Sequence, residues 1–304
     1  MVSPLGTLAL MRAEESPGTA NGAGAPSTIR RRALKRKPSA EVQRYRSGLL
    51  YPLTPRPRRS VLSTSFFTSL QRTLSNERIA RYAAGGGGDR GTYGRYLWNL
   101  ALCESLYPAF QGLEVSLRNA MHEAASRHYG TGWWFDGGKS PVAIRGYRAR
   151  RGRGGRWVHT DEAYKVEGSK RRLQQEGKPV QPGRVIAELT FGFWTALFNR
   201  HYVKEGLWPA LLPDVFPGLT TGRTIGVVRP RLEEVRRLRN RVFHHEPVWN
   251  DPDLADRHVR ILEAVSWVCP DTERLVRSVD RFAQVHSAGA ASYEAIIDRL
   301  AVVP

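Results

Sequence analysis

The segment from residue 239 to residue 250, RNRVFHHEPVWN, places an arginine, an asparagine and two histidines close together. Cutting RNA without a metal needs a base for the ribose 2′-hydroxyl, an acid for the leaving 5′-oxygen and a cation for the charge on phosphorus. Histidine can transfer protons near neutral pH, and arginine offers a charged planar group that matches phosphate oxygens. We therefore predict that Arg239, Asn240, His244 and His245 form a catalytic site for RNA cleavage.

Helical geometry restricts how these side chains can cooperate. Asn240 and His244 are four residues apart and share a helix face, whereas Arg239 and His244 lie roughly 140° apart around the axis. One helix does not easily aim both at one atom, but two copies paired about a two-fold axis would combine them in one cleft. Pro247 disfavours helix at the residue before it, which places both histidines in the last turn, where the helix dipole favours protonated imidazole.

A purely structural interpretation also fits so short a motif. In that interpretation, His244 and His245 only cap the end of a helix, and Arg239 forms ion pairs with Glu233 or Glu234. The two interpretations differ in what the rest of the chain must supply.

The composition points to an anionic partner. The net charge is +19 and the pI is near 10.6, and nucleic acid is the commonest partner of such basic proteins. Cys103 and Cys269 are the only cysteines, too few for a zinc cluster or a disulfide framework, and they suit a reducing cytosol. No apolar run approaches the roughly 18 residues that span a membrane, and no signal pattern opens the chain. We expect a cytoplasmic RNA-binding protein without a metal, cofactor or membrane contact.

Two segments differ in composition from the rest. Residues 1–60 are rich in Gly, Ala, Pro, Ser and Arg and predict a disordered basic tail, either an arm that grips nucleic acid or a dispensable extension. Residues 136–183 predict a flexible insertion with a charged, possibly helical piece over 161–175. Its arginines could bind RNA, or it is a solvated rim of the domain. The candidate RNA-binding residues in it are Arg148, Arg150, Arg151 and Arg153.

The first half of the domain over residues 61–304 shows helical patterns. Ser75 is placed to cap a helix that the glycine run 85–88 ends. A long pattern follows from Tyr93 to Tyr129, with Pro108 as a kink or a break.

The second half is helical as well. Residues 185–202 are apolar nearly all round, which predicts a buried helix. The helix with the motif begins after Pro230, a residue suited to a first turn. Amphipathic helices follow from Pro252 and from Asp271, and a short one near Tyr293 closes the chain. No alternating strand pattern is convincing, so we predict an all-α helical bundle.

Four stretches, in chain order, resemble one known family. They are LSNERIARY (74–82), RYLWNLALCESLYPAFQGLEVSLRNAMHEAASRHYGTGWW (95–134), VIAELTFGFWTALF (185–198) and RLRNRVFHHEPVWN (237–250). Together they resemble the Abi-like (abortive infection) branch of the HEPN superfamily, whose Arg-Asn-x-x-x-His motif the last stretch contains. The resemblance runs from about residue 62 to residue 282 and leaves out the basic tail and the arginine-rich insertion.

The resemblance implies an all-α HEPN fold and a homodimer with the motif at its interface. It also implies metal-independent endoribonuclease activity that leaves a 2′,3′-cyclic phosphate and a 5′-hydroxyl. By position, Arg239 and His244 are the implied catalytic pair, Asn240 is the polar residue that follows the arginine, and His245 is the second histidine of this branch. A recurrent stretch implies support for the cleft from Glu114, Arg118 and Asn119.

The implied biology is bacterial anti-phage defence by abortive infection, or a toxin–antitoxin system, with an antitoxin or a trigger protein as partner. Two other classes stay open. One is a HEPN-type RNA-binding protein that does not cut, against which the intact Arg239 and His244 speak. The other is a basic DNA-binding regulator, for which we find no helix-turn-helix spacing.

Overall fold

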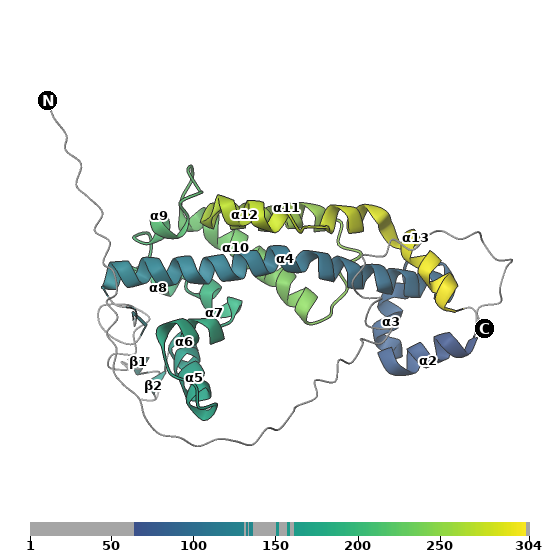
Figure 1. The fold of residues 1–304 in the computed structure, drawn as a ribbon, viewed down its shortest axis with the longest axis horizontal. Helices are drawn as coiled ribbons and strands as arrows, with labels where there is room; N and C mark the ends of the chain where they lie inside the picture. The colour runs from purple at the N-terminus through teal and green to yellow at the C-terminus, as the bar shows by residue number, and fades with distance from the viewer. Residues whose placement is uncertain are drawn as a thin grey trace, which may run out of the picture. The chain divides into compact units, whose positions relative to one another are not determined.

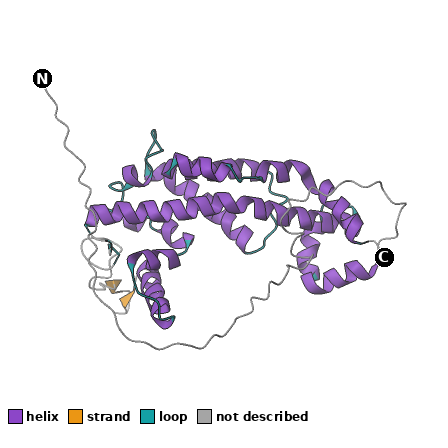
Figure 2. Cartoon of the chain, viewed as in Figure 1, coloured by secondary structure: helices purple, strands orange, loops and turns teal. Residues whose placement is uncertain are grey.

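The computed structural model describes residues 64–130, 132, 134–135, 150–151, 157–158 and 161–301 (Figure 1). The predicted tail over 1–60 lies outside these residues, and so do Arg148 and Arg153. The described chain is helical, as predicted, apart from two strands of two residues each (Figure 2). These are β1 (Arg150–Arg151) and β2 (Trp157–Val158), which pair antiparallel and were not expected from the sequence.

One long helix, α4 (Gly88–Tyr129), contacts most of the others. It begins five residues before the predicted start, after Gly87 with a left-handed φ of 79°, and ends at the predicted Tyr129, before Gly130 with a φ of 75°. Of the two alternatives at Pro108, a kink or a break, the break is wrong, since the helix continues through this residue. A proline removes one backbone donor, and packing of α4 against helices on several sides outweighs that loss.

Two helices precede α4 and are joined by Ser75. They are α2 (Thr64–Leu74) and α3 (Asn76–Ala83). The predicted cap is present, because the Ser75 hydroxyl accepts the amide N–H of Arg78 at 3.4 Å. The glycine run then separates α3 from α4, as predicted.

The predicted single buried helix over 185–202 is three short helices instead. They are α6 (Pro182–Glu188), α7 (Phe191–Ala196) and α8 (Arg200–Lys204). Extended backbone at Leu189 and Thr190 separates the first two, and the side chain of Asn199 caps the third by accepting two amide N–H groups. The predicted burial is confirmed: the core contains Val185, Ile186, Leu189, Phe191, Phe193, Trp194, Leu197 and Phe198.

The charged piece of the expected insertion is a helix, α5 (Asp161–Gln175). Val166 and Leu173 on it are buried, and the helix packs against α6 and α7. This part of the insertion is therefore an element of the core rather than a solvated rim.

The C-terminal half consists of α9 (Leu212–Val215), α10 (Ile225–Phe243), α11 (Leu254–Val268), α12 (Pro270–Arg277) and α13 (Phe282–Leu300). The helix with the motif, α10, begins before Pro230, which lies inside it. The pattern predicted from Asp271 is divided between α12 and α13. The short final helix predicted near Tyr293 is the second part of α13, which non-helical backbone at Gly289 (φ 63°, ψ 178°) divides in two.

The buried apolar side chains form two clusters. The main cluster includes residues of every helix from α4 to α12, among them the apolar face of α10, and Phe282 at the start of α13. The second cluster comes from α2, α3, the start of α4, the end of α13 and the residue that follows it. Its members are Phe67, Ile79, Tyr93, Ile297 and Ala301. Since α4 contributes to both clusters, it connects them.

Candidate functional site

The predicted motif ends α10 in a tight turn. The amide of Glu246 donates to the Arg241 carbonyl at 2.8 Å, and the amide of His245 donates to the Val242 carbonyl at 3.0 Å. This pair of bonds is a Schellman motif, whose central residue adopts the left-handed conformation that glycine usually provides. Here that residue is His245, with φ of 59°. Both histidines therefore follow the last helical residue, Phe243, rather than lying in the last turn as predicted.

The loop after the turn is held by α4. The Asn99 side-chain oxygen accepts the amides of Val248 at 2.7 Å and of Trp249 at 3.1 Å. The Trp249 ring lies 6.4 Å from Tyr82 and 5.6 Å from the guanidinium of the buried Arg95. Asn99 was not predicted as a site residue, because its partners are about 150 residues away in the chain.

Arg241 holds the same loop from the α10 side. Its guanidinium donates to the Pro247 carbonyl at 2.5 Å and to the Asp251 carboxylate at 2.8 Å. The Asp251 side chain is only 5% exposed and also lies 3.5 Å from Arg257. Contacts from both helices thus fix the backbone that carries the histidines.

His244 opens into a polar cavity of about 370 Å³ between α3 and the end of α10. Arg78 and Arg81 bring two positive charges to it, and the Arg78 guanidinium donates to the His245 carbonyl at 2.9 Å. The cavity is lined by Ser75, Glu77, Arg78, Arg81, Tyr82, His244, His245, Glu246 and Pro247. Neither arginine was predicted as a site residue, although both belong to the LSNERIARY stretch.

The same cavity contains two strained backbone positions. Ser75 (φ 64°) and His245 (φ 59°) are the non-glycine residues with positive φ in the described chain, and both line it. Such conformations cost about 1–3 kcal/mol and concentrate at functional sites. Their coincidence with His244 makes this cavity the best candidate for a functional site.

Arg239 lies elsewhere on α10 and does not line the His244 cavity. Its guanidinium is 3.7 Å from the Glu114 carboxylate on α4 and packs over the Phe243 ring at 4.1 Å. The expected ion pair with Glu233 or Glu234 is wrong. Those carboxylates lie 2.7 Å from Arg236 and Arg260, respectively.

The other predicted residues occupy different places. Asn240 is half-buried, and its carbonyl accepts the His244 amide at 2.8 Å. Arg118 is half-buried with a buried Nε that has no hydrogen-bond partner among the described residues, and Asn119 is exposed. Glu114 of this stretch forms its ion pair with Arg239 of α10. Arg150 and Arg151 form β1.

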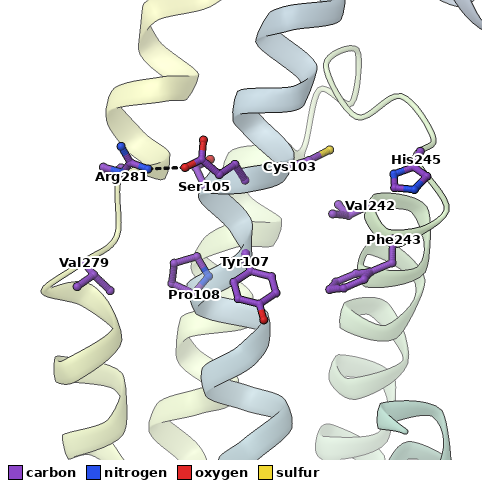
Figure 3. A pocket seen from close by; sticks show the side chains of 10 residues that line it. Cys103, Ser105, Tyr107, Pro108, Val242, Phe243, His245, Val279 and Arg281 are labelled. Atoms are coloured by element: carbon purple, nitrogen blue, oxygen red, sulfur yellow. Dashed lines mark hydrogen bonds and ion pairs between the residues drawn. The ribbon is translucent and has the colours of Figure 1, made fainter. Parts of the chain in front are cut away.

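A second cavity, of about 440 Å³, is also lined by His245 (Figure 3). Its walls are mainly apolar and come from α4, the end of α10 and the α12–α13 junction. The lining residues are Cys103, Glu104, Ser105, Tyr107, Pro108, Val242, Phe243, His245, Val279 and Arg281. Burial raises the pKa of the Cys103 thiol to about 11, although Arg241 opposes this, so the thiol is neutral and unreactive at neutral pH.

The described residues contain no group of three or more His, Cys, Asp or Glu side chains placed to hold a metal ion. No helix in the described part of the chain combines the length and the apolar character that crossing a bilayer requires. The chain matches no protein-family model, no curated protein and no solved structure. Its function therefore has to be inferred from the geometry around His244.

Proposed function

We propose that the protein is a metal-independent endoribonuclease of the cytoplasm, with His244 as a catalytic residue. The observation that carries this proposal is the cavity in which an exposed imidazole meets Arg78 and Arg81. Two guanidinium groups suit a phosphate, and the imidazole supplies the proton transfer that cleavage requires. The HEPN-like sequence stretches agree with this chemistry.

The proposed reaction is an internal transesterification. A base removes the proton of the ribose 2′-hydroxyl, and the 2′-oxygen attacks the adjacent phosphorus. The bond from phosphorus to the 5′-oxygen then breaks, and an acid protonates that oxygen. The products are a 2′,3′-cyclic phosphate and a 5′-hydroxyl. His244 and His245 both line the cavity, which provides one imidazole for each proton transfer, while the two arginines stabilise the charge on the phosphate oxygens.

Arg239 enters this proposal through a second copy of the chain. It lies outside the His244 cavity of its own copy, and three apolar side chains on α4 and at the end of α10 are exposed: Leu100 by 48%, Tyr107 by 50% and Phe243 by 40%. An isologous dimer that placed these side chains along a shared cleft would bring Arg239 of one copy toward His244 of the other. The ion pair with Glu114 is long and partly exposed, so a phosphate could displace it at little cost.

The direct test is cleavage of single-stranded RNA in the presence of EDTA. We expect the wild type to cut and His244→Ala to lose activity by about 100-fold or more, the usual contribution of a general acid or base. His201→Ala is the matched control, because His201 is also exposed but lies on α8. The proposal fails if the wild type leaves RNA intact, or if the new 3′ ends created by the cut are hydroxyls.

The shared site has its own test. Arg239→Ala and His244→Ala should each be inactive, but an equal mixture that exchanges subunits should regain about a quarter of wild-type activity, because half of the dimers then contain one intact composite site. If both residues act within one copy, the mixture stays inactive.

A second candidate function is RNA binding without cleavage. The observation that favours it is the separation of Arg239, neutralised in part by Glu114, from the His244 cavity. In that case the wild type and His244→Ala bind RNA without cutting it. If cleavage is found, we further propose a role as the toxic effector of a defence or toxin–antitoxin system, held inactive by an antitoxin or trigger protein. Expression of the wild type should then arrest growth, and expression of His244→Ala should not.

A further inference from the structure

We propose that the apolar cavity beside His245 binds a nucleobase of the RNA next to the phosphate held at His244. This inference rests on the proposed function and deepens it, since it assigns the group that selects among RNA sequences. His245 lines both the polar cavity with the two arginines and the apolar cavity. A nucleotide has the same division into an anionic phosphate and a flat, largely apolar base.

The aromatic side chains of the cavity suit a flat ligand. Tyr107 projects from α4 and Phe243 from α10, with ring centroids 6.3 Å apart and planes tilted by 41° (Figure 3). Both rings are about half exposed, although aromatic side chains of this size are usually more buried. Exposed aromatic rings beside a cationic groove are the usual means of stacking single-stranded bases.

The charges around the cavity fit a neutral base better than a second phosphate. The lining includes the Cys103 thiol, which burial keeps neutral, and the apolar side chains of Pro108, Val242 and Val279. Arg281 also lines this cavity, but its charge is paired with Glu104, whereas Arg78 and Arg81 line the other cavity. The two cavities therefore divide the ligand between them.

The rim of the apolar cavity offers polar groups for the edge of a base. The Arg281 guanidinium donates to the Glu104 carboxylate at 2.6 Å, and both side chains are more than half exposed. An ion pair this exposed contributes little to stability. One member accepts and the other donates hydrogen bonds, so the pair can exchange its mutual contact for contacts with a base.

The test uses full-length protein and short 2′-O-methyl RNA oligonucleotides, which cannot be cut because the attacking hydroxyl is blocked. Each oligonucleotide lacks the base at one position, and affinity is measured by fluorescence anisotropy. We expect removal of one particular base to weaken wild-type binding by about 10-fold or more, the usual effect of one stacked base. Tyr107→Ala should bind the intact oligonucleotide as weakly as the wild type binds the abasic one, and Tyr107→Phe should retain the preference.

The controls separate stacking from other effects. Tyr164→Ala removes another exposed aromatic ring, on α5 and outside the cavity, and should bind as the wild type does. Phe243→Leu serves as a second variant, because it removes the other aromatic ring of the cavity and keeps an apolar contact for Arg239. The proposal is overturned if no abasic position weakens wild-type binding, or if Tyr107→Ala weakens intact and abasic oligonucleotides equally.

Parallel cleavage assays on unmodified RNA keep the two proposals distinct. If binding depends on one base but no RNA is cut, the proposal that the apolar cavity binds a base holds and the proposal of nuclease activity fails. Cleavage without base dependence at Tyr107 would sustain the nuclease and reject the base cavity.

Discussion

The two sides of the His244 cavity rest on apolar clusters of very different size. His244 and His245 follow α10, whose apolar face belongs to the main cluster. Arg78 and Arg81 lie on α3, whose Ile79 belongs to the second cluster of five buried residues. A small cluster buries little apolar area, so it stabilises its elements less against local opening. The arginine side of the cavity should therefore open more often than the histidine side.

The largest expected effect comes from matched truncations in the two clusters. Leu232→Ala in the main cluster should lower the free energy of unfolding by about 2–5 kcal/mol. Ile79→Ala removes a similar side chain from the second cluster and should mainly speed amide hydrogen exchange in α2 and α3, with a smaller change in the urea midpoint. If both variants shift the midpoint equally and leave α3 protected, the two clusters unfold as one unit.

The next largest effect concerns the loop on the histidine side. Asn99→Ala leaves the amides of Val248 and Trp249 without their acceptor and should cost about 1–3 kcal/mol in the free energy of unfolding. Asn99→Asp keeps an acceptor and is the matched control, expected to lose less. Equal losses in urea titrations of the two variants would mean that the acceptor does not hold the loop.

A smaller effect should appear on acidification. Burial lowers the pKa of His258 on α11, with Arg277 and His286 acting in the same direction and Asp280 opposing, and burial also lowers the pKa of His122 on α4. The unfolded chain therefore binds more protons than the folded chain below about pH 6.5. The free energy of unfolding should be highest above about pH 6.5 and should fall as the pH is lowered below that value. His258→Gln should show a shallower decline in thermal midpoint between pH 7.5 and pH 5.5; an unchanged decline would exclude His258 as its source.

The smallest expected effect is a gain. His245→Gly relieves the left-handed backbone at the end of α10 but adds entropy to the unfolded chain. We expect a net change of less than about 1 kcal/mol in favour of the folded state. If the variant is more stable but cuts RNA poorly, the His245 imidazole serves the site, as proposed. If cutting is unaffected, His245 serves only the turn.

Local signals in the sequence were enough for several helices. The cap at Ser75, the stop at Gly130 and the amphipathic pattern of α11 each depend on residues within a few positions of one another, and the structure has all three. Pro108 shows where such signals fail. A proline favours a break when its neighbours are considered alone, but the helices packed along α4 decide otherwise.

The candidate site was predictable only in part for the same reason. The motif on α10 could be read as a group of reactive side chains, and its Arg239 and His244 do point to different surroundings, as helical geometry suggested. Arg78 lies beside His244 in the cavity, and Glu114 pairs with Arg239. Each of these two partners is more than 120 positions away in the sequence from the motif residue that it contacts or faces. No spacing rule within one helix connects them.

Because α4 is unbroken, the gene should tolerate few changes of length in the part that encodes this helix. Arg95, Asn99, Cys103, Tyr107, Phe110 and Glu114 form a stripe along α4 at intervals of three or four residues, and all face the segment 239–249. Each residue of a helix adds about 100° of rotation, so the loss of one codon within this stretch would turn one half of the stripe away from its partners. A gene with a single substitution in this stretch of α4 can still encode a functional protein. A gene whose length changes by one codon within the stretch should not.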